Sequence, residues 1–353
     1  MTAVNIPWWK TPTTELSIDW IEKAQQHQDC LTKPQGSLGT LEHIAIKLCA
    51  IQKTLEPNID QVGIYIFAAD HGIVEEGVSA FPQAVTVEML KNFVAGGAAI
   101  SVLANQINAS LDVINLGTLE AGNTLPGIIQ RSQGAGTNNF AHEAAMSFEQ
   151  FEQALTCGKE MAEQAAQRQQ TLFIGGEMGI GNTTSAAAIV AQLTGQSAIQ
   201  VSGKGTGLDD KGVSHKAWVI ERALKAHSAN IHTPEDTLIY LGGFEIVALT
   251  GAYIRAAQLG LAILVDGFIC SAAALAAIRI NPSITDFMFY AHQSAEQGHS
   301  AVLTASNAKP LLNLGLRLGE GSGAAVAAPL FRLACALHNN MATFAQAEVS
   351  KKL

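Results

Sequence analysis

Short runs of apolar residues recur along the chain and constrain its fold more than any other feature of the sequence. Strands that helices cover on both faces have this nearly continuous apolar character. The stretches between the runs are long enough for helices, and such alternation predicts a doubly wound α/β layer with a parallel sheet. The predicted strands are Val62 to Ala68, Leu111 to Leu116, Leu172 to Gly175, Leu238 to Leu241, Ala262 to Val265 and Phe287 to Tyr290.

Helical patterns lie between these strands and at the two chain ends. Residues 1–55 are helix-like with no predicted strand, and the last residues are polar. We expect an α/β catalytic domain over 56–339, and we expect 1–55 and 340–353 to join as a small helical domain or to form a dimer contact. The predicted helices of the larger domain are Val87 to Asn105, Glu149 to Gln169, Thr183 to Leu193, Lys216 to Ala226, Phe244 to Gln258, Ser271 to Ile278 and Ser322 to Leu337.

Glycine and polar residues follow the predicted strands. If the crossovers are right-handed, these loops all lie at one edge of the sheet. Ligands of open α/β sheets bind at that edge, which is therefore the expected active site. The loops are Asp70-His71-Gly72, Gly117-Thr118, Gly175-Gly176-Glu177, Gly242-Gly243, Asp266-Gly267 and His292-Gln293-Ser294.

Composition narrows the class of partner. The chain has 353 residues, 48% of them hydrophobic and 14% charged, with a net charge of -9. An acidic chain without a basic stripe does not fit a nucleic-acid partner. The five cysteines form no C-x-x-C pair and are odd in number, which is typical of a reduced, cytoplasmic protein with buried thiols.

We expect neither a signal peptide nor a membrane span. The first residues lack the basic and apolar regions that a signal peptide needs. The run from Leu259 to Ile280 is apolar enough to resemble a span, but Asp266 and Gly267 interrupt it. It predicts a strand followed by a buried helix.

The segment from Gly175 to Ser185 has the pattern of a phosphate-binding turn. Glycines let backbone N–H groups converge, and the helix that follows presents its positive N-terminus. Asn182-Thr183 stands where a P-loop needs Lys-Ser/Thr, and the acidic residue of a dinucleotide fingerprint is missing. The alternative is a tight turn with an Asn or Thr helix cap.

A second glycine-rich loop, Gly203 to Asp210, precedes Lys216. Lysines near such a loop could meet an anionic ligand as point charges. The alternative is a solvated loop with two turn-forming aspartates. Asp209-Asp210 lacks further ligands at a regular spacing, so we predict no metal there.

The loop from Asp70 to Gln83 supplies apolar contact together with polar groups. His71 fits a general base, and Asp70-His71 fits a metal pair, but a lone histidine near a strand end is more often a hydrogen-bonded structural residue, and we favour that interpretation. Ser79, Phe81 and Gln83 suit a flat aromatic ligand. His292, Ser294 and His299 form another polar loop.

Glu320 stands between two glycines, after the leucine-rich run Leu314 to Leu318 and before an alanine-rich helix. Glycines allow a substrate to approach closely. An apolar wall would raise the pKa of this carboxyl group and make it a usable proton acceptor. The alternative is an exposed acidic residue before a helix N-terminus, where such residues are favoured.

Taken together, these motifs resemble those of the nicotinate-nucleotide–dimethylbenzimidazole phosphoribosyltransferases. Each segment is modest alone, but in this order they cover nearly the whole chain. They are Lys33 to Gly39, Ala69 to Gly72 with Val78-Ser79 and Pro82, Gly176 to Thr184, Gly203 to Gly207, Asp266-Gly267, Ala291 to Ser294 and Leu314 to Ala325.

The resemblance implies a Rossmann-like parallel sheet, a small helical domain built from the chain ends, and a homodimer. It implies transfer of phosphoribose from nicotinate mononucleotide to 5,6-dimethylbenzimidazole, with no cofactor or metal. The products would be α-ribazole 5′-phosphate, the precursor of cobalamin's lower ligand, and nicotinate. Glu320 takes the position of the family's general base, and the configuration at C1′ inverts.

The resemblance also suggests substrate contacts. The 5′-phosphate would rest on the turn that contains Gly176, Gly179, Gly181 and Asn182, and on the loop that contains Gly203 and Gly205. Glu177 and Lys216 are expected to contact the ribose or the phosphate. Ser294 is expected to contact the nucleotide. The benzimidazole would be lined by Ser79, Gln83 and Leu318.

Three alternatives stay open at this point. The same donor could serve a different aromatic acceptor. A non-catalytic nucleotide-binding protein could share the fold, but it would not need Glu320. A transferase that uses phosphoribosyl pyrophosphate would show an acidic pair after a strand, leading into a hydroxyl-rich loop, and Val265-Asp266-Gly267 does not continue that way.

Overall fold

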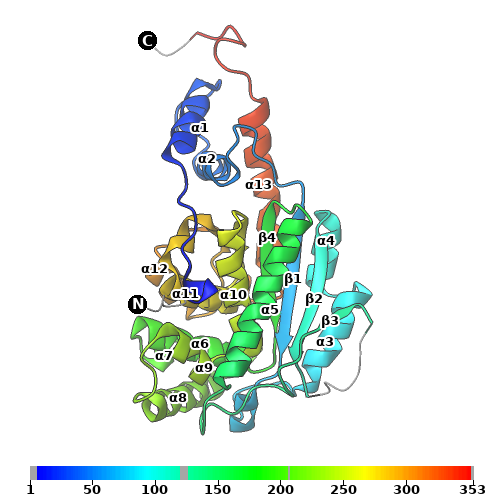
Figure 1. Cartoon of the computed structure of the whole chain (residues 1–353), viewed down its shortest axis with the longest axis vertical. Helices are drawn as coiled ribbons and strands as arrows, with labels where there is room; N and C mark the ends of the chain where they lie inside the picture. The colour runs from blue at the N-terminus through cyan, green and yellow to red at the C-terminus, as the bar shows by residue number, and fades with distance from the viewer. Residues whose placement is uncertain (1–5, 120–125, 206, 351–353) are drawn as a thin grey trace.

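The computed structural model describes residues 6–119, 126–205 and 207–350. Thr206 of the second glycine loop lies outside these residues, as do 1–5 and 351–353 of the predicted helical domain. One parallel sheet forms the centre of the molecule (Figure 1), which confirms the predicted α/β class. Its strands are β1 (Val62–Ala69), β2 (Ser110–Gly117), β3 (Ile128–Gln130), β4 (Leu172–Met178), β5 (Ala262–Val265), β6 (Met288–His292) and β7 (Pro310–Leu312).

The strand order is β3-β2-β1-β4-β5-β6-β7, which is the Rossmann-like arrangement that we expected. The order reverses between β1 and β4, so the loops after these two strands diverge and leave a crevice at the carboxyl edge of the sheet. Asp70 and His71 follow β1, and Glu177 lies near the end of β4. The fold therefore brings the ends of both strands to the crevice, where Glu177 lines the cleft, whereas the side chains of Asp70 and His71 are buried.

Two neighbouring glycines of β4 show how closely both faces of the sheet are covered. Successive side chains of a strand point to opposite faces. A Cβ at Gly175 would lie 2.5 Å from Leu249 Cδ2, whereas a Cβ at Gly176 would lie 2.7 Å from the backbone of Glu320. One face of β4 thus contacts a helix, and the other contacts the turn that carries the predicted base.

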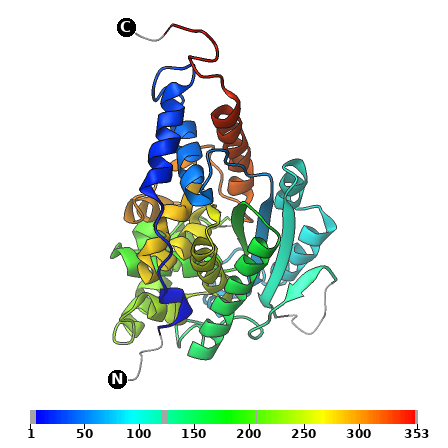
Figure 2. The same ribbon diagram turned by 45° about the horizontal axis from the view of Figure 1, so that its top comes forward.

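Helices cover both faces of the sheet (Figure 2). Helix α10 lies over β1, β4 and β5 and packs against α5 and α11, whereas α3 contacts β1, β2 and β4, α4 contacts β2, and α13 contacts β4, β5 and β6. The helices around the sheet are α3 (Ala84–Ala95), α4 (Ala99–Gln106), α5 (Phe148–Gln167), α6 (Asn182–Thr194), α7 (Ala198–Val201), α8 (Asp210–His227), α9 (Pro234–Leu241), α10 (Phe244–Gln258), α11 (Phe268–Ile280), α12 (His299–Ala305) and α13 (Ser322–Asn340). Short 3-10 helices are η1 (Trp8–Lys10), η2 (Gly72–Glu76) and η3 (Pro282–Phe287).

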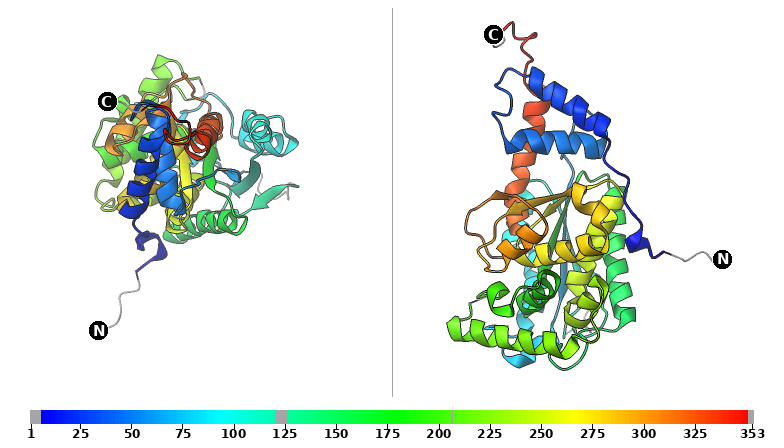
Figure 3. Two further views of the ribbon diagram at one scale, coloured as in Figure 1. Left: turned by 90° about the horizontal axis from the view of Figure 1, so that it is seen from above. Right: turned by 90° about the vertical axis from the view of Figure 1, so that its left-hand side faces the viewer.

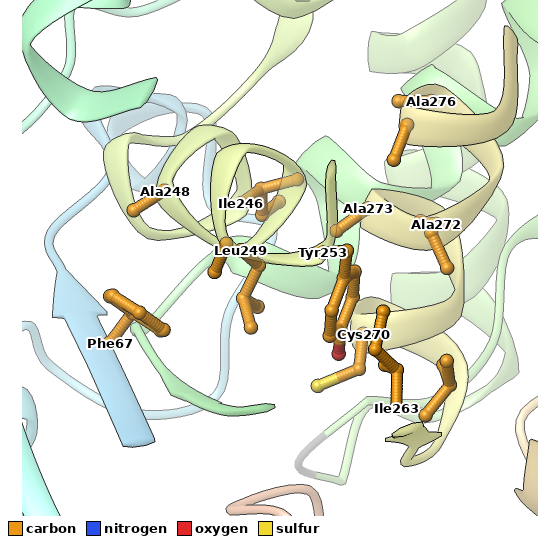
Figure 4. Packing of buried hydrophobic residues seen from close by; sticks show 14 of the residues in the cluster. Phe67, Ile246, Ala248, Leu249, Tyr253, Ile263, Cys270, Ala272, Ala273 and Ala276 are labelled. Atoms are coloured by element: carbon orange, nitrogen blue, oxygen red, sulfur yellow. The ribbon is translucent and has the colours of Figure 1, made fainter. Parts of the chain in front are cut away.

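The interior between α10 and α11 is apolar and rich in alanine. Figure 4 shows Leu249 and Tyr253 of α10 among these side chains, with Tyr253 beside Cys270 of α11. All three are buried. Small side chains let the helices approach one another closely, so many dispersion contacts form over a short distance.

Helices from the N-terminal and C-terminal parts of the chain meet in a helical unit above the sheet (Figure 3), whereas η1 contacts α10. Helices α1 (Ile18–Cys30) and α2 (Thr40–Gln52) pack against each other, and α2 packs against α13. The backbone N–H of Thr32 donates to Ala342, and the N–H of Phe344 donates to Cys30. Because α13 runs unbroken from the sheet into this unit, it belongs to both parts, and a domain boundary near 339 stays a prediction.

Three local predictions were wrong. Leu238 to Leu241 is the end of helix α9 and not a strand, because Thr233 caps the helix with Asp236 and Pro234 occupies its first turn. The single helix predicted from Val87 to Asn105 is divided into α3 and α4 by Gly96, whose φ is 84°. The edge strands β3 and β7, each only three residues long, were not predicted.

Two apolar stretches of the sequence resemble membrane spans, and the structure shows what each of them forms. The run from Leu259 to Ile280 forms β5 and the buried helix α11, as predicted. Residues 84–106 are apolar enough to cross a membrane when counted as one helix, but they form α3 and α4, which contact the sheet. The five cysteines are free thiols; four are buried, and Cys30 is exposed, contrary to expectation.

Candidate active site

A cleft of about 580 Å³ opens at the carboxyl edge of the sheet. It lies over the ends of β4, β5 and β6 and under the turn that leads into α13. Most of the predicted site residues meet there, together with several that were not predicted. The cleft is lined by apolar side chains on one part of its wall and by the carboxylates of Glu177, Asp266, Glu296 and Glu320 on the rest.

The turn that carries Glu320 has an unusual backbone. Gly319, Glu320 and Gly321 all have left-handed φ values, of 90°, 63° and 77°. A residue other than glycine in this conformation costs about 1–3 kcal/mol, so the surroundings must hold it. Asp266 does so, because its Oδ2 accepts the N–H of Gly321 at 3.2 Å and its Oδ1 accepts the N–H of Ala324 at 2.8 Å.

Glu320 is buried in the cleft wall, with 6% of its surface exposed. Burial raises the pKa of its carboxyl group, and the negative charge of Asp266 raises it further. The backbone N–H of Ile100 lowers the pKa, because it donates a hydrogen bond to Oε2 at 3.4 Å. Leu318 lines the cleft, but Leu314 does not and is 60% exposed. The predicted leucine wall is therefore only partial, and the carboxylate owes its burial to the sheet beneath it.

Glu177 is a second buried carboxyl group in the cleft. Burial raises its pKa to about 8, against the opposing effect of Asn182, whose side-chain amide donates to Oε2. Glu177 is thus largely protonated at neutral pH and can donate a proton in a hydrogen bond. Gly319 is required beside it, because a Cβ there would lie 2.3 Å from Glu177 Oε1.

The glycine turn that was predicted to bind phosphate joins β4 to α6, although Gly176 and Glu177 of the predicted turn lie within β4. Gly181, with a φ of 99°, ends the turn after β4, and Asn182 begins α6. The positive end of α6 therefore faces the cleft edge, where Asn182 and Thr183 line it. Lys216 donates from Nζ to Thr183 Oγ1 at 2.7 Å, and burial lowers its pKa to about 8.

Seven of the thirteen predicted residues line the cleft, and two line a small adjoining chamber. The cleft residues are Glu177, Gly179, Asn182, Gly205, Ser294, Leu318 and Glu320. Ser79 and Gly181 line the chamber, which shares Gly179, Asn182 and Gly205 with the cleft.

The other four lie behind the wall. Gln83 donates from Nε2 to the carbonyl of His71 at 2.9 Å. Gly176 contacts the turn of Glu320, and Lys216 contacts Thr183. A Cβ at Gly203 would lie 2.0 Å from Glu296 Oε2, so this glycine leaves room for a carboxylate. These residues support others that reach the cleft.

His71 is a structural residue, as the favoured interpretation predicted. Its Nε2 lies 2.8 Å from Glu245 Oε1, and both side chains are completely buried. A Cβ at Gly243 would lie 2.2 Å from His71 Cε1, so Gly243 belongs to the same contact. The imidazole therefore forms part of the buried interior, in contact with Glu245.

Sequence reasoning missed several residues of the cleft. Asp266 and His292 were noted only as loop residues after strands, yet Asp266 holds the turn of Glu320. Arg317 donates to the carbonyl of Gly205 at 3.2 Å and so joins two loops. Glu296 gave no signal, because a single acidic residue in a polar loop is ordinary. Apolar lining residues that were also missed are Val85, Met89, Met178 and Ile180.

Comparisons with known proteins show the family to which the chain belongs. A family model described as phosphoribosyltransferase matches residues 13–349. Two relatives are named nicotinate-nucleotide–dimethylbenzimidazole phosphoribosyltransferase. The protein from Pseudomonas putida is 56% identical to this chain over 98% of each sequence, and the protein from Pseudomonas aeruginosa is 53% identical over 99% of each.

Solved structures show that the similarity extends from the sequence to the fold. The crystal structure of CobT from Thermus thermophilus matches with a TM-score of 0.90 and 40% identity, covering 95% of this chain and all of that one. A structure from the same organism, titled as the nicotinate-nucleotide–dimethylbenzimidazole enzyme, matches with a TM-score of 0.89, 39% identity and the same coverage. The chain is thus a transferase that belongs to the nicotinate-nucleotide–dimethylbenzimidazole phosphoribosyltransferase family.

Proposed function

We propose that this enzyme transfers the 5-phosphoribosyl group of nicotinate mononucleotide to 5,6-dimethylbenzimidazole. The products are α-ribazole 5′-phosphate and nicotinate. The observation that carries the proposal is the position of Glu320, a buried carboxylate with a raised pKa in a cleft that also reaches the glycine turn and the N-terminus of α6. The transfer needs a base for the acceptor and a binding site for the donor's phosphate, and Glu320 and the N-terminus of α6 would supply both within one cleft.

The bond changes need only one protein base. One benzimidazole nitrogen attacks C1′ of the ribose, and the bond from C1′ to the pyridinium nitrogen breaks. That electron pair goes to the departing ring, which leaves as neutral pyridine nitrogen in nicotinate. The other benzimidazole nitrogen loses its proton to Glu320, and general-base help of this kind contributes about 10²–10⁴-fold.

Stereochemistry follows from the placement of the two rings. Acceptor and leaving group lie on opposite sides of the ribose, so the configuration at C1′ inverts from β to α. Holding both rings in that geometry supplies the orientation part of the rate enhancement.

The charges of the cleft fit the donor. Its phosphate would lie at the positive end of α6, in the turn from Gly176 to Asn182, where Lys216 supports Thr183. Arg317 adds a positive charge at the loop of Gly205. The cationic pyridinium would lie toward the carboxylates, which favour a positive charge in a partly dry site.

The apolar part of the cleft fits the acceptor. Phe81, Val85, Met89 and Met178 line it together with Leu318. Flat aromatic bases bind between such side chains, and a few polar groups fix their orientation. Glu320 is the polar group that would meet the ring N–H.

The test is a direct assay with a matched variant. The protein is incubated with nicotinate mononucleotide and a panel of aromatic bases, and products are identified by mass spectrometry. We expect α-ribazole 5′-phosphate with dimethylbenzimidazole, and at least about 10²-fold slower turnover in Glu320→Gln with unchanged nucleotide affinity. Glu88→Gln, which removes an exposed carboxylate of α3, should behave as wild type.

Two results would contradict the proposal. Turnover of Glu320→Gln near the wild-type rate would remove Glu320 from the role of base. Faster transfer to a different base on the panel would replace dimethylbenzimidazole as the acceptor and leave the donor chemistry intact.

A further inference from the structure

Glu296 is a buried carboxylate in the cleft that the transfer chemistry does not use. It lies in the loop between β6 and α12, it is 9% exposed, and its side chain lines the cleft. Its Oε2 is buried against Gly203, and among the described residues no donor forms a hydrogen bond with it. The other oxygen, Oε1, is left to accept hydrogen bonds from a ligand in the cleft, and such bonds would offset the cost of holding this carboxylate in the wall.

The loop around Glu296 is firmly held, so the unpaired carboxylate is not a consequence of a loose segment. The N–H of Ser294 donates to His299 Nδ1 at 2.7 Å, and the N–H of His299 donates to the carbonyl of Glu296 at 3.1 Å. On the other side, the N–H of Ala295 donates to the carbonyl of Leu316 at 2.9 Å. The backbone thus presents this carboxylate at a fixed place.

The neighbours of Glu296 exclude a phosphate as its partner. A carboxylate repels a phosphate, and Gly203 at the start of the second glycine loop lies directly against Oε2. The nearby cation is Lys216, which donates one of its three hydrogens to Thr183 and none to Glu296 Oε2. Burial lowers the pKa of Lys216, and the charge of Glu296 partly opposes that effect. A neutral group with hydroxyl donors remains as the natural ligand.

We propose that Glu296 is a specificity-determining residue that accepts hydrogen bonds from the ribose hydroxyl groups of the donor. This inference rests on the proposed function, because it takes the donor to be a 5-phosphoribosyl nucleotide. Carboxylates serve this purpose in other nucleotide sites, where an acidic residue accepts the ribose hydroxyl. The phosphate would lie on the α6 side and the hydroxyl groups on the Glu296 side of the same cleft.

The test compares sugars and not only rates. Transfer to dimethylbenzimidazole is measured with nicotinate mononucleotide and with its 2′-deoxy and 3′-deoxy analogues, each corrected for breakdown without enzyme. A hydrogen bond to a charged group corresponds to about 10–100-fold in kcat/KM. We expect the wild type to prefer the ribonucleotide over at least one deoxy analogue by that factor, mainly through KM.

The variants Glu296→Gln and Glu296→Ala should lose that preference. Their kcat/KM for the ribonucleotide should fall about 10–100-fold, whereas that for the discriminated analogue should change little. Glu143→Gln, which changes an exposed carboxylate elsewhere, should keep the preference. If Glu296 only balances the charge of Lys216, all three donors should weaken equally, and the inference is overturned.

The inference and the proposed function fail in different ways. A wild type that transfers no phosphoribose from any of the donors overturns both. A wild type that makes α-ribazole 5′-phosphate, with variants that keep its full preference for the ribonucleotide, overturns only the role of Glu296.

Discussion

Two regions of this enzyme bring groups unusually close together, and glycine makes both possible. In the contact between α5 and α10, a Cβ at Gly158 would lie 1.8 Å from the carbonyl oxygen of Ala248. Beneath the cleft, a Cβ at Gly176 would lie 2.7 Å from the backbone of Glu320. The first approach joins two helix backbones, whereas the second brings a strand under the turn of Glu320.

The difference lies in what the close approach achieves. At Gly158 the groups in contact are uncharged backbone atoms of Ala248 and Ala252, so the gain is packing. At Gly176 the contact is also with backbone, but the turn that it supports carries Glu320 among other carboxyl groups, and burial together with their mutual repulsion raises the pKa of Glu177 and Glu320. The same residue type therefore supports stability in one region and reactivity in the other, and substitutions should separate the two.

The largest effect on stability is expected from Gly158→Ala. The new Cβ would meet a backbone oxygen that cannot move without shifting α10, so the free energy of unfolding should fall by about 3 kcal/mol. Urea denaturation followed by circular dichroism measures it. The matched control is Gly212→Ala in α8, whose nearest neighbour is the flexible side chain of Leu208.

This control should change the free energy of unfolding by about 1 kcal/mol or less, because alanine also favours the helix. Protein with Gly158→Ala that remains folded should keep the wild-type kcat, since the cleft is not involved. Equal stability of the two variants would show that the contact between α5 and α10 adapts to the added methyl group. The close approach at Gly158 would then not be needed for stability.

The next effect is on activity and is expected from Gly176→Ala. The added methyl group would displace the backbone of Glu320, and a misplacement of about 1 Å can reduce turnover about 10²-fold. The neighbouring variant Gly175→Ala is the control, because its Cβ points to Leu249 and Tyr253 on the opposite face.

Gly175→Ala should lower stability while its folded fraction keeps a nearly normal kcat. Steady-state kinetics and denaturation on both variants measure the two quantities side by side. Should both variants lose turnover to the same degree, the position of Glu320 would not depend on the face of β4 that contacts it.

The same division explains what the sequence could predict. The strands β1, β2, β4, β5 and β6 and the bounds of α10 follow from apolar patterns that packing alone dictates. The error at Leu238 to Leu241 arose because a buried run of four apolar residues is equally compatible with a strand and a helix end. The cap at Thr233 was the signal that could have decided it.

The site was predictable where a motif is local. Glu320 between its glycines and the turn from Gly176 to Asn182 could be recognised, because the glycines that mark them are neighbours in sequence. Asp266 and Glu296 could not, since their importance comes from contacts with segments far away in the chain: Asp266 with Gly321 and Ala324, Glu296 with Gly203. Such pairings exist only after folding.

The smallest effect concerns charge and should appear as a shift in pH dependence. In the proposed mechanism Glu320 accepts a proton only when it is ionised, so kcat should fall as the pH drops through its raised pKa. The negative charge of Asp266 is one cause of that rise. Asp266→Asn removes the charge but keeps an oxygen that can accept a hydrogen bond, so the pKa of Glu320 should decrease and the acidic limb should move to lower pH.

The profile of kcat against pH, measured for wild type, Asp266→Asn and the exposed control Asp60→Asn, decides between two roles of this aspartate. If Asp266 tunes the base electrostatically, only its variant shifts the limb. If the limb stays in place while kcat falls at every pH, Asp266 acts solely by anchoring Gly321 and Ala324. The crowding of charges in the cleft would then hold the turn of Glu320 in place without setting its basicity, and burial alone would account for the raised pKa.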